Sequence, residues 1–474
     1  MEVIKPYTTY KDSGIAWLGE IPEHWEIKKA RNIGEFNGST VDKKIDESQQ
    51  KVRLVNFLDV YNNPKFEIHE KPFMVVTAKD EQIKKFRVNI GDVVFTPSSE
   101  VREDIGRSAV IKYEANDLVH SYHVIRLKFK ENLDINFKKY LFNNYFVLKY
   151  FSKVCTGSTR KILTRQNFNN IELAIPTLPE QTAIANFLDY KTAKIDRFIF
   201  KKKQLIKLLN EQKAAIINDA VTKGQNPNAK MKPSGIEWLG EIPEHWEVRK
   251  IKSLGNAIIG LTYSPLELTD EGKGTLVLRS SNVQNAKITY DDCVYVTTKI
   301  PEKKRTIKGD ILICSRNGSV RLIGKNAIID EKASGQSFGA FMTIFRSSYF
   351  EYLHYFFNSA SFKAQSGLFS TSTINQLTTG ILNNILVAIP LDIKEQKLVV
   401  SHIEKETSII NKTIATIEKE IALVQEYRTA LIAEAVTGKI DVREYNVPSF
   451  EEDKEYVELE EEMGLVAEEE INLD

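Results

Sequence analysis

Cysteine is scarce in this sequence of 474 residues, and the usual signals of export and membrane insertion are absent. The three cysteines, Cys155, Cys293 and Cys314, are odd in number and far apart. This pattern fits neither a disulfide framework nor a zinc cluster, and it indicates a reducing compartment. No apolar run approaches the length of a membrane span, and the opening MEVIKPYTTYKDSG has no apolar core of a secretory signal. We therefore expect a cytoplasmic protein.

Motifs of catalysis are missing as well. The sequence has no G-x-x-x-x-G-K-[ST] loop, no G-x-G-x-x-G turn after a strand, no H-E-x-x-H, no EF-hand loop and no G-x-S-x-G elbow. The adenine-methylating signature, Asn or Asp followed by two prolines and an aromatic residue, is absent too. His120 and His123 lie three apart in an expected strand, which is poor zinc geometry without cysteines or a second pair. We expect neither a catalytic residue nor a metal site.

The net charge of the whole chain is close to zero, but positive and negative residues are distributed unevenly along it. The 65 Lys and Arg residues nearly equal the 64 Asp and Glu residues. Residues 451–474 hold twelve acidic residues and only Lys454, so residues 1–450 carry +12. A basic body favours a polyanionic partner. We interpret the acidic tail as a solvated, partly disordered appendage, with screening of the basic surface or docking on a partner as alternatives.

The strongest pattern that is present is a repeated segment, residues 174–224 and 388–438. From Glu180 against Glu395 onward, the copies align without a gap at an offset of 215. In each copy Ile-Pro precedes the expected helix and a glycine lies at its end, which are start and stop signals of a helix. We expect helices of about 60 Å, at ~1.5 Å per residue.

Apolar residues in these segments recur four and three apart, a heptad stripe that needs a partner helix. In a single copy such a stripe is typical of ordinary core packing, but two copies give each stripe a mate. We therefore expect the two helices to pair with each other as a coiled coil. Lys202 and Lys213 lie on the first stripe. They either extend along the helix and keep their charge in water at the edge of the stripe, or they contact phosphate or a partner. The stripe residues are Ile195, Ile199, Ile206, Leu209 and Ile216, then Ile410, Ile414, Ile417, Ile421, Val424 and Leu431.

Two further repeats divide the chain into halves. Residues 13–29 and 234–250 share fourteen of seventeen positions and contain all four tryptophans, which is typical of a segment that packs on another element. We interpret His24 and His245 in this anchor as structural. Residues 91–110 and 309–328 also match, and they predict a strand, a polar loop and a second strand.

Between the anchors and the long segments, the composition is that of mixed α/β domains. Residues 51–61 and 275–283 read as strands, and the aromatic stretches 137–151 and 349–362 as helices. We predict an α+β fold with two homologous domains related by a pseudo-twofold axis. The predicted divisions are an anchor and first domain (1–173), a first spacer helix (174–224), a linker, anchor and second domain (225–387), a second spacer helix (388–442) and the acidic tail (443–474).

Loops of both domains combine arginine or lysine with small hydroxyl and amide side chains. Arginine can bind guanine edges and Asn adenine edges, whereas Ser, Thr and Lys mostly hold phosphates. Each such residue alone is more often a solvated loop residue, but clusters at matching places in two halves favour DNA contact. The predicted DNA-binding residues are Ser98, Ser99, Arg102, Arg107, Ser158, Thr159, Arg160, Lys161, Arg165, Arg279, Ser280, Ser281, Asn282, Ser315, Arg316, Asn317, Arg321 and Lys325.

The chain contains twice, in the same order, a W-L-G-E-I-P-x-H-W anchor, a divergent domain and an I-P…E-Q helix that ends in A-V-T. This doubled order resembles the specificity subunit (HsdS) of type I restriction-modification enzymes. The resemblance covers about residues 13–442; the acidic tail departs from the family pattern. It implies a non-catalytic, DNA-binding subunit with two target recognition domains that read a bipartite, asymmetric site. The two helices would run antiparallel and set the gap: residues 195–220 span about 39 Å, and half-sites one turn apart lie roughly 34 Å apart.

The resemblance also implies partners. Two modification subunits would methylate adenine N6 with S-adenosylmethionine, and two restriction subunits could add ATP- and Mg-dependent translocation and cleavage. This subunit would bind double-stranded DNA, no cofactor of its own and no membrane. Two alternatives stay open: a coiled-coil scaffold whose repeated domains bind protein, and a self-contained nuclease or methyltransferase.

Overall fold

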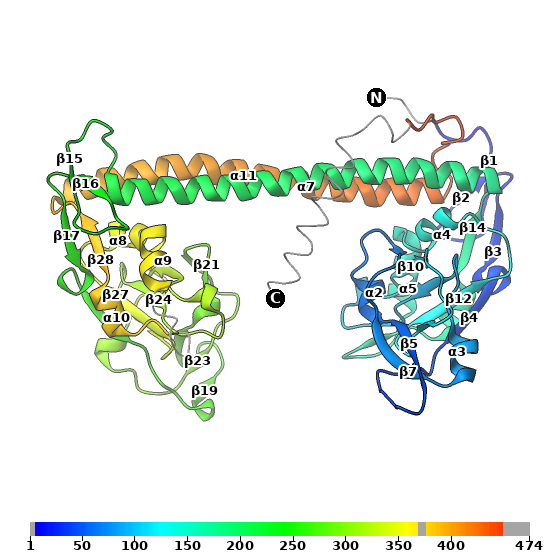
Figure 1. Cartoon of the computed structure of the whole chain (residues 1–474), viewed down its shortest axis with the longest axis horizontal. Helices are drawn as coiled ribbons and strands as arrows, with labels where there is room; N and C mark the ends of the chain where they lie inside the picture. The colour runs from blue at the N-terminus through cyan, green and yellow to red at the C-terminus, as the bar shows by residue number, and fades with distance from the viewer. Residues whose placement is uncertain (1–4, 368–375, 449–474) are drawn as a thin grey trace. The chain divides into compact units, whose positions relative to one another are not determined.

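The chain forms two units in the computed structural model, which describes residues 5–367 and 376–448. Unit 1 comprises residues 1–202 with 419–474, and unit 2 comprises residues 203–418. Each unit contains one domain of mixed strands and helices and one part of each of two long helices (Figure 1). The predicted fold class is confirmed. The acidic tail beyond residue 448 lies outside the described residues.

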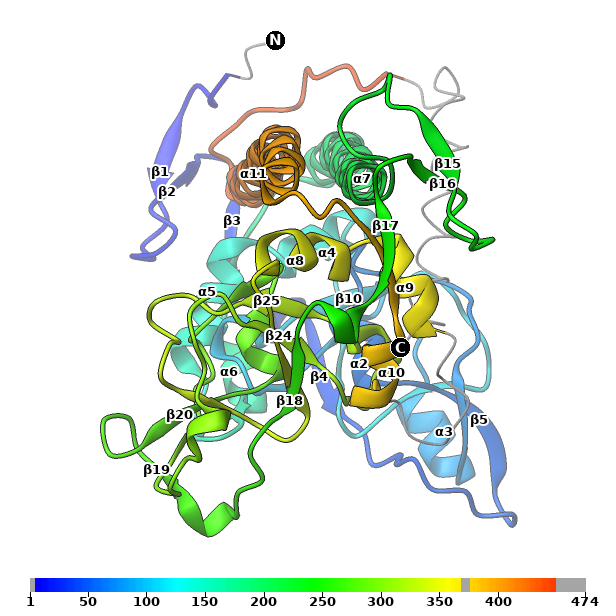
Figure 2. The same cartoon turned by 90° about the vertical axis from the view of Figure 1, so that its left-hand side faces the viewer.

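The two repeated segments form the long helices α7 (Leu178–Lys223) and α11 (Ile393–Val436), as predicted. In unit 1 the beginning of α7 shares a core with the end of α11, through Ile184 and Leu431 among others. In unit 2 the end of α7 shares a core with the beginning of α11, through Val221 and Ile403. Within each unit the two helices therefore run antiparallel, and Figure 2 shows them side by side.

The heptad stripe is the contact surface of this pair. Every residue of the predicted stripe is buried or half-buried, whereas Leu208 and Leu423, which lie off it, are 60% and 64% exposed. Polar residues on the stripe pair across the helices. Lys202 contacts Glu420 at 2.7 Å in unit 1, and Lys213 donates to the Asn411 amide oxygen at 2.8 Å in unit 2. The seam lysines are therefore held by the opposite helix.

Unit 1 contains a five-stranded sheet in the order β4-β12-β8-β10-β6 and a three-stranded sheet in the order β11-β5-β7. Neighbours are antiparallel except in the parallel pairs β10–β6 and β11–β5. Three two-stranded ladders, β1–β2, β3–β14 and β9–β13, complete the unit. The strands are β1 (Tyr10–Asp12), β2 (Glu20–Pro22), β3 (Glu26–Lys29), β4 (Gly34–Gly38), β5 (Gln50–Val55), β6 (Glu67–Ile68), β7 (Met74–Ala78), β8 (Val93–Phe95), β9 (Ser98–Ser99), β10 (Ser108–Ile111), β11 (Leu118–His120), β12 (Ile125–Phe129), β13 (Lys161–Ile162) and β14 (Glu172–Ile175).

Unit 2 contains two four-stranded sheets, in the orders β18-β27-β24-β25 and β19-β23-β20-β26. Only the β20–β26 pair within these sheets is parallel. Its ladders are β15–β16, β17–β28 and β21–β22. The strands are β15 (Met231–Pro233), β16 (Glu241–Pro243), β17 (Glu247–Lys250), β18 (Asn256–Ile259), β19 (Leu268–Thr269), β20 (Thr275–Leu278), β21 (Val283–Gln284), β22 (Lys287–Ile288), β23 (Tyr295–Val296), β24 (Ile311–Cys314), β25 (Asn326–Ile328), β26 (Ser337–Phe338), β27 (Met342–Arg346) and β28 (Leu386–Ile389).

Short helices pack on these sheets. The α-helices are α1 (Ala30–Ile33), α2 (Phe57–Tyr61), α3 (Asp80–Phe86), α4 (Ile135–Phe142), α5 (Tyr145–Val154), α6 (Arg165–Asn170), α8 (Phe350–Phe357), α9 (Ala360–Gly367) and α10 (Thr379–Asn384). The 3-10 turns are η1 (Arg102–Asp104), η2 (Ile251–Ser253), η3 (Pro265–Glu267), η4 (Ser280–Asn282), η5 (Glu302–Lys304) and η6 (Val320–Leu322).

The local expectations meet a mixed outcome. The strand–loop–strand repeat is confirmed by β8 with β10 and by β24 with β25, each an antiparallel pair. The prediction of a single strand over residues 51–61 was wrong, because Asn56 caps helix α2 with a capping box and ends β5. The strand predicted over residues 275–283 likewise ends at Leu278, and the chain continues as η4. The first aromatic stretch forms two helices, because Asn144 caps α5.

The repeated anchor packs on the start of each long helix. Its last residues form β3 and β17, which pair antiparallel with β14 and β28, the strands that lead into α7 and α11. Both Trp25 and Trp246 are fully buried. In both halves the anchor pairs with the strand that leads into a long helix. The two anchors are nearly identical in sequence because they pack in the same way.

A glutamate in the first turn of each long helix holds the anchor side chains. His24 Nε2 donates to Glu180 at 2.8 Å, and the Trp25 indole donates to the same oxygen at 3.4 Å. In unit 2, His245 and Trp246 donate to Glu395 at 2.9 and 2.8 Å. Burial would raise the pKa of the Glu180 carboxyl, but the hydrogen bonds that it accepts outweigh burial and lower it. The structural interpretation of both histidines is consistent with these contacts.

The glycine after α11 allows close approach of the first anchor. Gly438 has φ +72°, and a Cβ there would lie 2.3 Å from Pro22 and 3.2 Å from the Trp25 ring. We expect Gly438→Ala to lower the free energy of unfolding by about 2–5 kcal/mol, from left-handed strain and overpacking together. Urea denaturation measures the loss. Gly14→Ala is the matched control, because Gly14 has φ +70° but nothing within 4 Å; an equal loss in the two variants would contradict the role of the anchor contact.

Candidate nucleic-acid interface

Two loops that are distant in sequence meet in unit 1. The short ladder β9–β13 pairs Ser99 with Lys161 and Ser98 with Ile162. Arg160 Nε donates to Ser98 Oγ at 3.1 Å. The structure therefore joins residues 98–99 to residues 160–162, one part of each predicted DNA-binding cluster of the first half, in a polar surface of arginine, lysine and hydroxyl groups.

An aromatic pair that the sequence analysis did not assign to DNA lies beside this surface. Tyr122 is 49% exposed, and its ring lies 3.8 Å from that of His123. Burial first, and then the positive charges of Arg160 and Lys43, lower the pKa of His123. An exposed aromatic ring among cations is suited to stacking on a base. The only signal in the sequence was the polar HSYH turn after a strand.

The remaining predicted residues of the first half are spread around this surface. Ser158 and Thr159 are exposed in the loop before β13, and Lys161 Nζ donates to the carbonyls of Gly157 and Ser158. Arg102 donates to the carbonyl of Ser152 at 3.0 Å. Arg165 contacts Glu35 at 3.5 Å.

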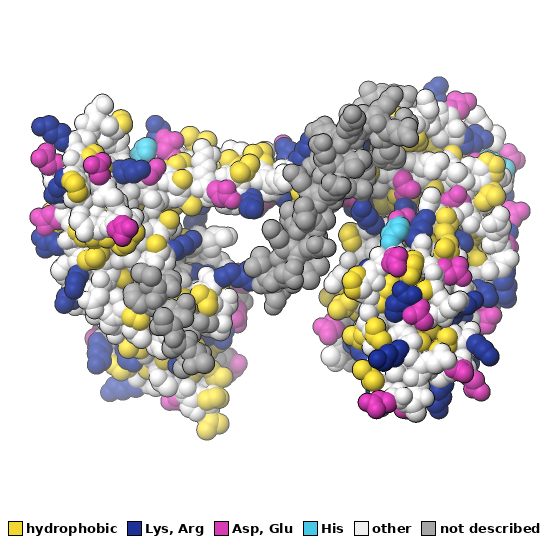
Figure 3. All heavy atoms as spheres, in the orientation of Figure 1, with side chains coloured by type: hydrophobic (Ala, Val, Ile, Leu, Met, Phe, Trp, Pro, Cys, Tyr) yellow, Lys and Arg dark blue, Asp and Glu magenta, His cyan; other side chains and the backbone are white. Residues whose placement is uncertain are grey.

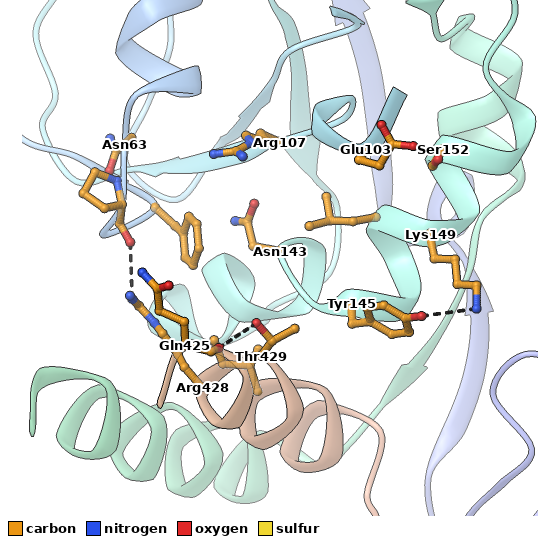
Figure 4. A pocket seen from close by; sticks show the side chains of 14 residues that line it. Asn63, Glu103, Arg107, Asn143, Tyr145, Lys149, Ser152, Gln425, Arg428 and Thr429 are labelled. Carbon is orange, nitrogen blue, oxygen red and sulfur yellow. Dashed lines mark hydrogen bonds between the residues drawn. The ribbon is translucent and has the colours of Figure 1, made fainter. Parts of the chain in front are cut away.

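Arg107 has a different environment. Its guanidinium pairs with Asp104 and lies 5.0 Å from the Tyr61 ring centroid. It lines a cavity of about 680 Å³ that the side chains of α11, including Arg428, close from the other side (Figure 4). Its side chain contacts Asp104 and Tyr61 rather than the Ser98–Arg160 group.

Unit 2 repeats the junction of two loops. Arg316 forms an antiparallel bridge with Gln376, at the position where Ser98 and Ser99 meet β13 in unit 1. Asn317 Nδ2 donates to Ser280 Oγ at 3.4 Å, and Lys325 Nζ donates to the Ser280 carbonyl at 3.3 Å. The structure therefore brings the η4 cluster and the 315–325 cluster together.

Arginine and an exposed aromatic ring again lie close together here. The Arg316 guanidinium is 5.4 Å from the Phe341 ring centroid, and Phe341 is 59% exposed. Arg321 is exposed on η6. Arg279 is half-buried and pairs with Asp292 at 2.8 Å. Phe341 and Gln376 were missed from the sequence because neither belongs to a basic cluster.

Several predicted residues hold the loops in place. Ser99 and Ser315 are buried, and Ser315 Oγ donates to the Phe341 carbonyl at 3.0 Å. Asn282 is fully buried and donates to two carbonyls in the segment 289–292. The Ser281 hydroxyl is buried in the same turn. DNA contact by the predicted residues stays a prediction, and it now centres on the exposed ones.

Surface charge is mixed on the face of the molecule that Figure 3 shows. On the face shown in Figure 3, lysine and arginine side chains are intermingled with carboxylates on both units. The clusters above share a combination of cation, amide or hydroxyl, and exposed ring.

The histidines considered for zinc have other surroundings. His120 is fully buried, its Nδ1 lies 3.2 Å from the Val124 carbonyl, and His123 follows β11 in a turn. Over residues 5–367 and 376–448, no group of three or more His, Cys, Asp and Glu side chains could hold a metal ion. All three cysteines are free.

Buried His120 makes the stability of unit 1 dependent on pH. Burial, with the charge of Arg126, lowers the pKa of its imidazole to about 3. The unfolded chain binds this proton below about pH 6.5 whereas the folded chain does not, so stability falls as the pH falls from 6.5 towards 3. Between pH 7 and pH 5, wild type should lose about 2 kcal/mol more than His120→Gln in urea denaturation. Equal losses would contradict the assignment; His354→Gln is the parallel test in unit 2, where burial lowers the pKa to about 4.

The helices in the described part of the chain were also compared with the length and hydropathy of a membrane span. No helix there is long and apolar enough to cross a membrane.

Comparison with known proteins agrees with this duplicated architecture. A family model described as the type I restriction modification DNA specificity domain matches residues 22–208 and 243–422. Each match spans one α/β domain and a part of the following long helix. The chain belongs to the type I restriction modification DNA specificity domain family.

Individual relatives match either nearly the whole chain or about two fifths of it. The putative type I restriction enzyme MjaX specificity subunit of Methanocaldococcus jannaschii is 25% identical over 446 residues, 90% of this chain and 96% of that protein. The EcoKI specificity subunit of Escherichia coli is 26% identical over 208 residues, 42% of this chain and 44% of that protein. A chain from a solved structure of the type I R-M system matches with a TM-score of 0.65 and 14% identity, and covers 89% of this chain and 99% of that chain. That structural likeness shows the fold.

Proposed function

We propose that this chain is the specificity subunit of a type I restriction-modification complex, and that its two α/β domains read the two halves of a bipartite, asymmetric DNA site. One observation carries the proposal. Each unit joins two distant loops into a polar surface, through Ser99 with Lys161 in unit 1 and Arg316 with Gln376 in unit 2. The junction is the same, but the side chains differ, which is what two readers of different DNA words require.

In this proposal the subunit itself performs no chemistry. Two modification subunits would dock on it and methylate adenine N6, with S-adenosylmethionine bound by them. Restriction subunits, where present, would add cleavage that depends on ATP and Mg. The paired helices α7 and α11 would set the gap between the half-sites.

The test is to co-express the chain with a modification subunit encoded beside it and to map methylated adenines on the host DNA. We expect a split motif with a constant gap and one methylated adenine in each half. A continuous motif would contradict the bipartite reading. A complex that assembles but methylates no sequence would favour the scaffold alternative, and methylation by the purified chain alone would overturn its non-catalytic role.

A further inference from the structure

One face of α7 in unit 1 is both basic and apolar. Lys191, Lys194, Phe198 and Lys201 follow one another three and four positions apart, so they share a face of the helix. Lys194 and Lys201 are exposed, and Phe198 is 38% exposed. A stripe that combines cations with an exposed ring is suited to a partner with carboxylates and apolar side chains.

The C-terminal segment of the chain runs toward this face. Arg443 lies 3.9 Å from Glu180, in the first turn of α7. Two residues later, the Tyr445 ring packs on Phe187 with centroids 4.9 Å apart, and Lys191 Nζ lies 4.9 Å from the Tyr445 centroid. Between these two contacts the segment advances from the first turn of α7 to Lys191, in the direction of Lys194 and Phe198. The described chain ends at Pro448, three residues further on.

The residues that follow have matching chemistry and sufficient reach. Residues 451–474 contain twelve acidic side chains against one lysine. Tyr456, Leu459, Met463 and Val466 recur three and four apart among them, which supplies apolar side chains at regular spacing. From Tyr445, six extended residues reach about 20 Å, whereas Lys201 lies about 17 Å beyond Tyr190 along the helix.

We propose that the Lys191–Lys194–Phe198–Lys201 face of α7 is the docking surface for the acidic tail, residues 451–474 of the same chain. Docked there, the tail cancels positive charge on the helix and covers the Phe198 ring. The tail and this face carry opposite charges, and the described chain ends close enough to the face for the tail to reach it. The inference does not rest on the proposed function.

Zero-length carbodiimide coupling of the full chain, followed by peptide mapping, tests the contact directly. This reagent joins only amines and carboxylates that touch. We expect coupling of Lys191, Lys194 or Lys201 to carboxylates of residues 451–474. Coupling of the tail to lysines elsewhere, such as Lys161 or Lys325 in the recognition loops, or no coupling of the tail at all, would overturn the proposal.

Cleavage of the tail by a glutamate-specific protease provides the second measurement. We expect the double variant Lys194→Glu, Lys201→Glu to expose the tail and to speed its cleavage about 3- to 10-fold at low salt, since each exposed ion pair contributes little. The matched control is Lys84→Glu, Lys130→Glu, which makes the same charge change on exposed residues of unit 1. Equal acceleration in both variants, or none in either, would also overturn it.

Discussion

Replacing Arg316 and Arg321 with alanine is expected to abolish most discrimination at one half-site and to leave the other half-site unchanged. Arg316 lies at the junction of two loops in unit 2 and beside the exposed Phe341 ring, and Arg321 is exposed on η6. A bidentate arginine contact to guanine contributes about 1–3 kcal/mol of discrimination. Each lost contact should therefore relax the preference at its base about 5- to 150-fold.

The measurement is methylation by the assembled complex of DNA substrates altered at each position of either half-site. The reciprocal variant, Arg160→Ala with Lys161→Ala, should relax only the other half-site, because these residues belong to unit 1. Arg249→Ala is the control: it removes one positive charge from strand β17 of unit 2, where Arg249 pairs with Glu247. Equal losses at both half-sites in the Arg316, Arg321 variant would refute the assignment of one domain to one half.

Replacing Trp246 with alanine is expected to have the largest effect on stability. The side chain is fully buried, its indole donates to Glu395 at 2.8 Å, and its ring lies edge-on to Tyr352. A Cβ on Gly224, at the end of α7, would already lie 3.2 Å from this ring. The cavity and the lost hydrogen bond should lower the free energy of unfolding by about 3–5 kcal/mol.

Hydrogen exchange at increasing urea concentration measures this loss separately in peptides of each unit. We expect the loss to be confined to unit 2, because Trp246 belongs to the core that joins α7, α11 and the second domain. Trp238 is 40% exposed in the same anchor, so Trp238→Ala should cost less than about 1 kcal/mol. If Trp238→Ala were as damaging as Trp246→Ala, the anchor would not act through the buried indole.

The recognition residues illustrate where a single sequence stops being informative. Ser98 and Arg160 are 62 positions apart and hydrogen-bonded, and Ser280 and Asn317 are 37 apart and hydrogen-bonded. Both clusters of each half were visible as basic, hydroxyl-rich loops, but their junction was not. Burial also separates residues that look alike in sequence, since Asn282 holds a turn from within the core whereas Arg321 is exposed.

The sequence by itself determined the duplication, the two long helices and their paired stripe. These features are periodic, and the heptad spacing over residues 195–216 and 410–431 indicates directly which residues need a partner. The tertiary structure alone decided that Glu180 and Glu395 hold the anchors, that Arg428 pairs with Asp196, and that two distant loops meet in each unit. These contacts join residues far apart in the chain, and their formation depends on how strands and helices pack, which leaves no periodic signal in the residues themselves.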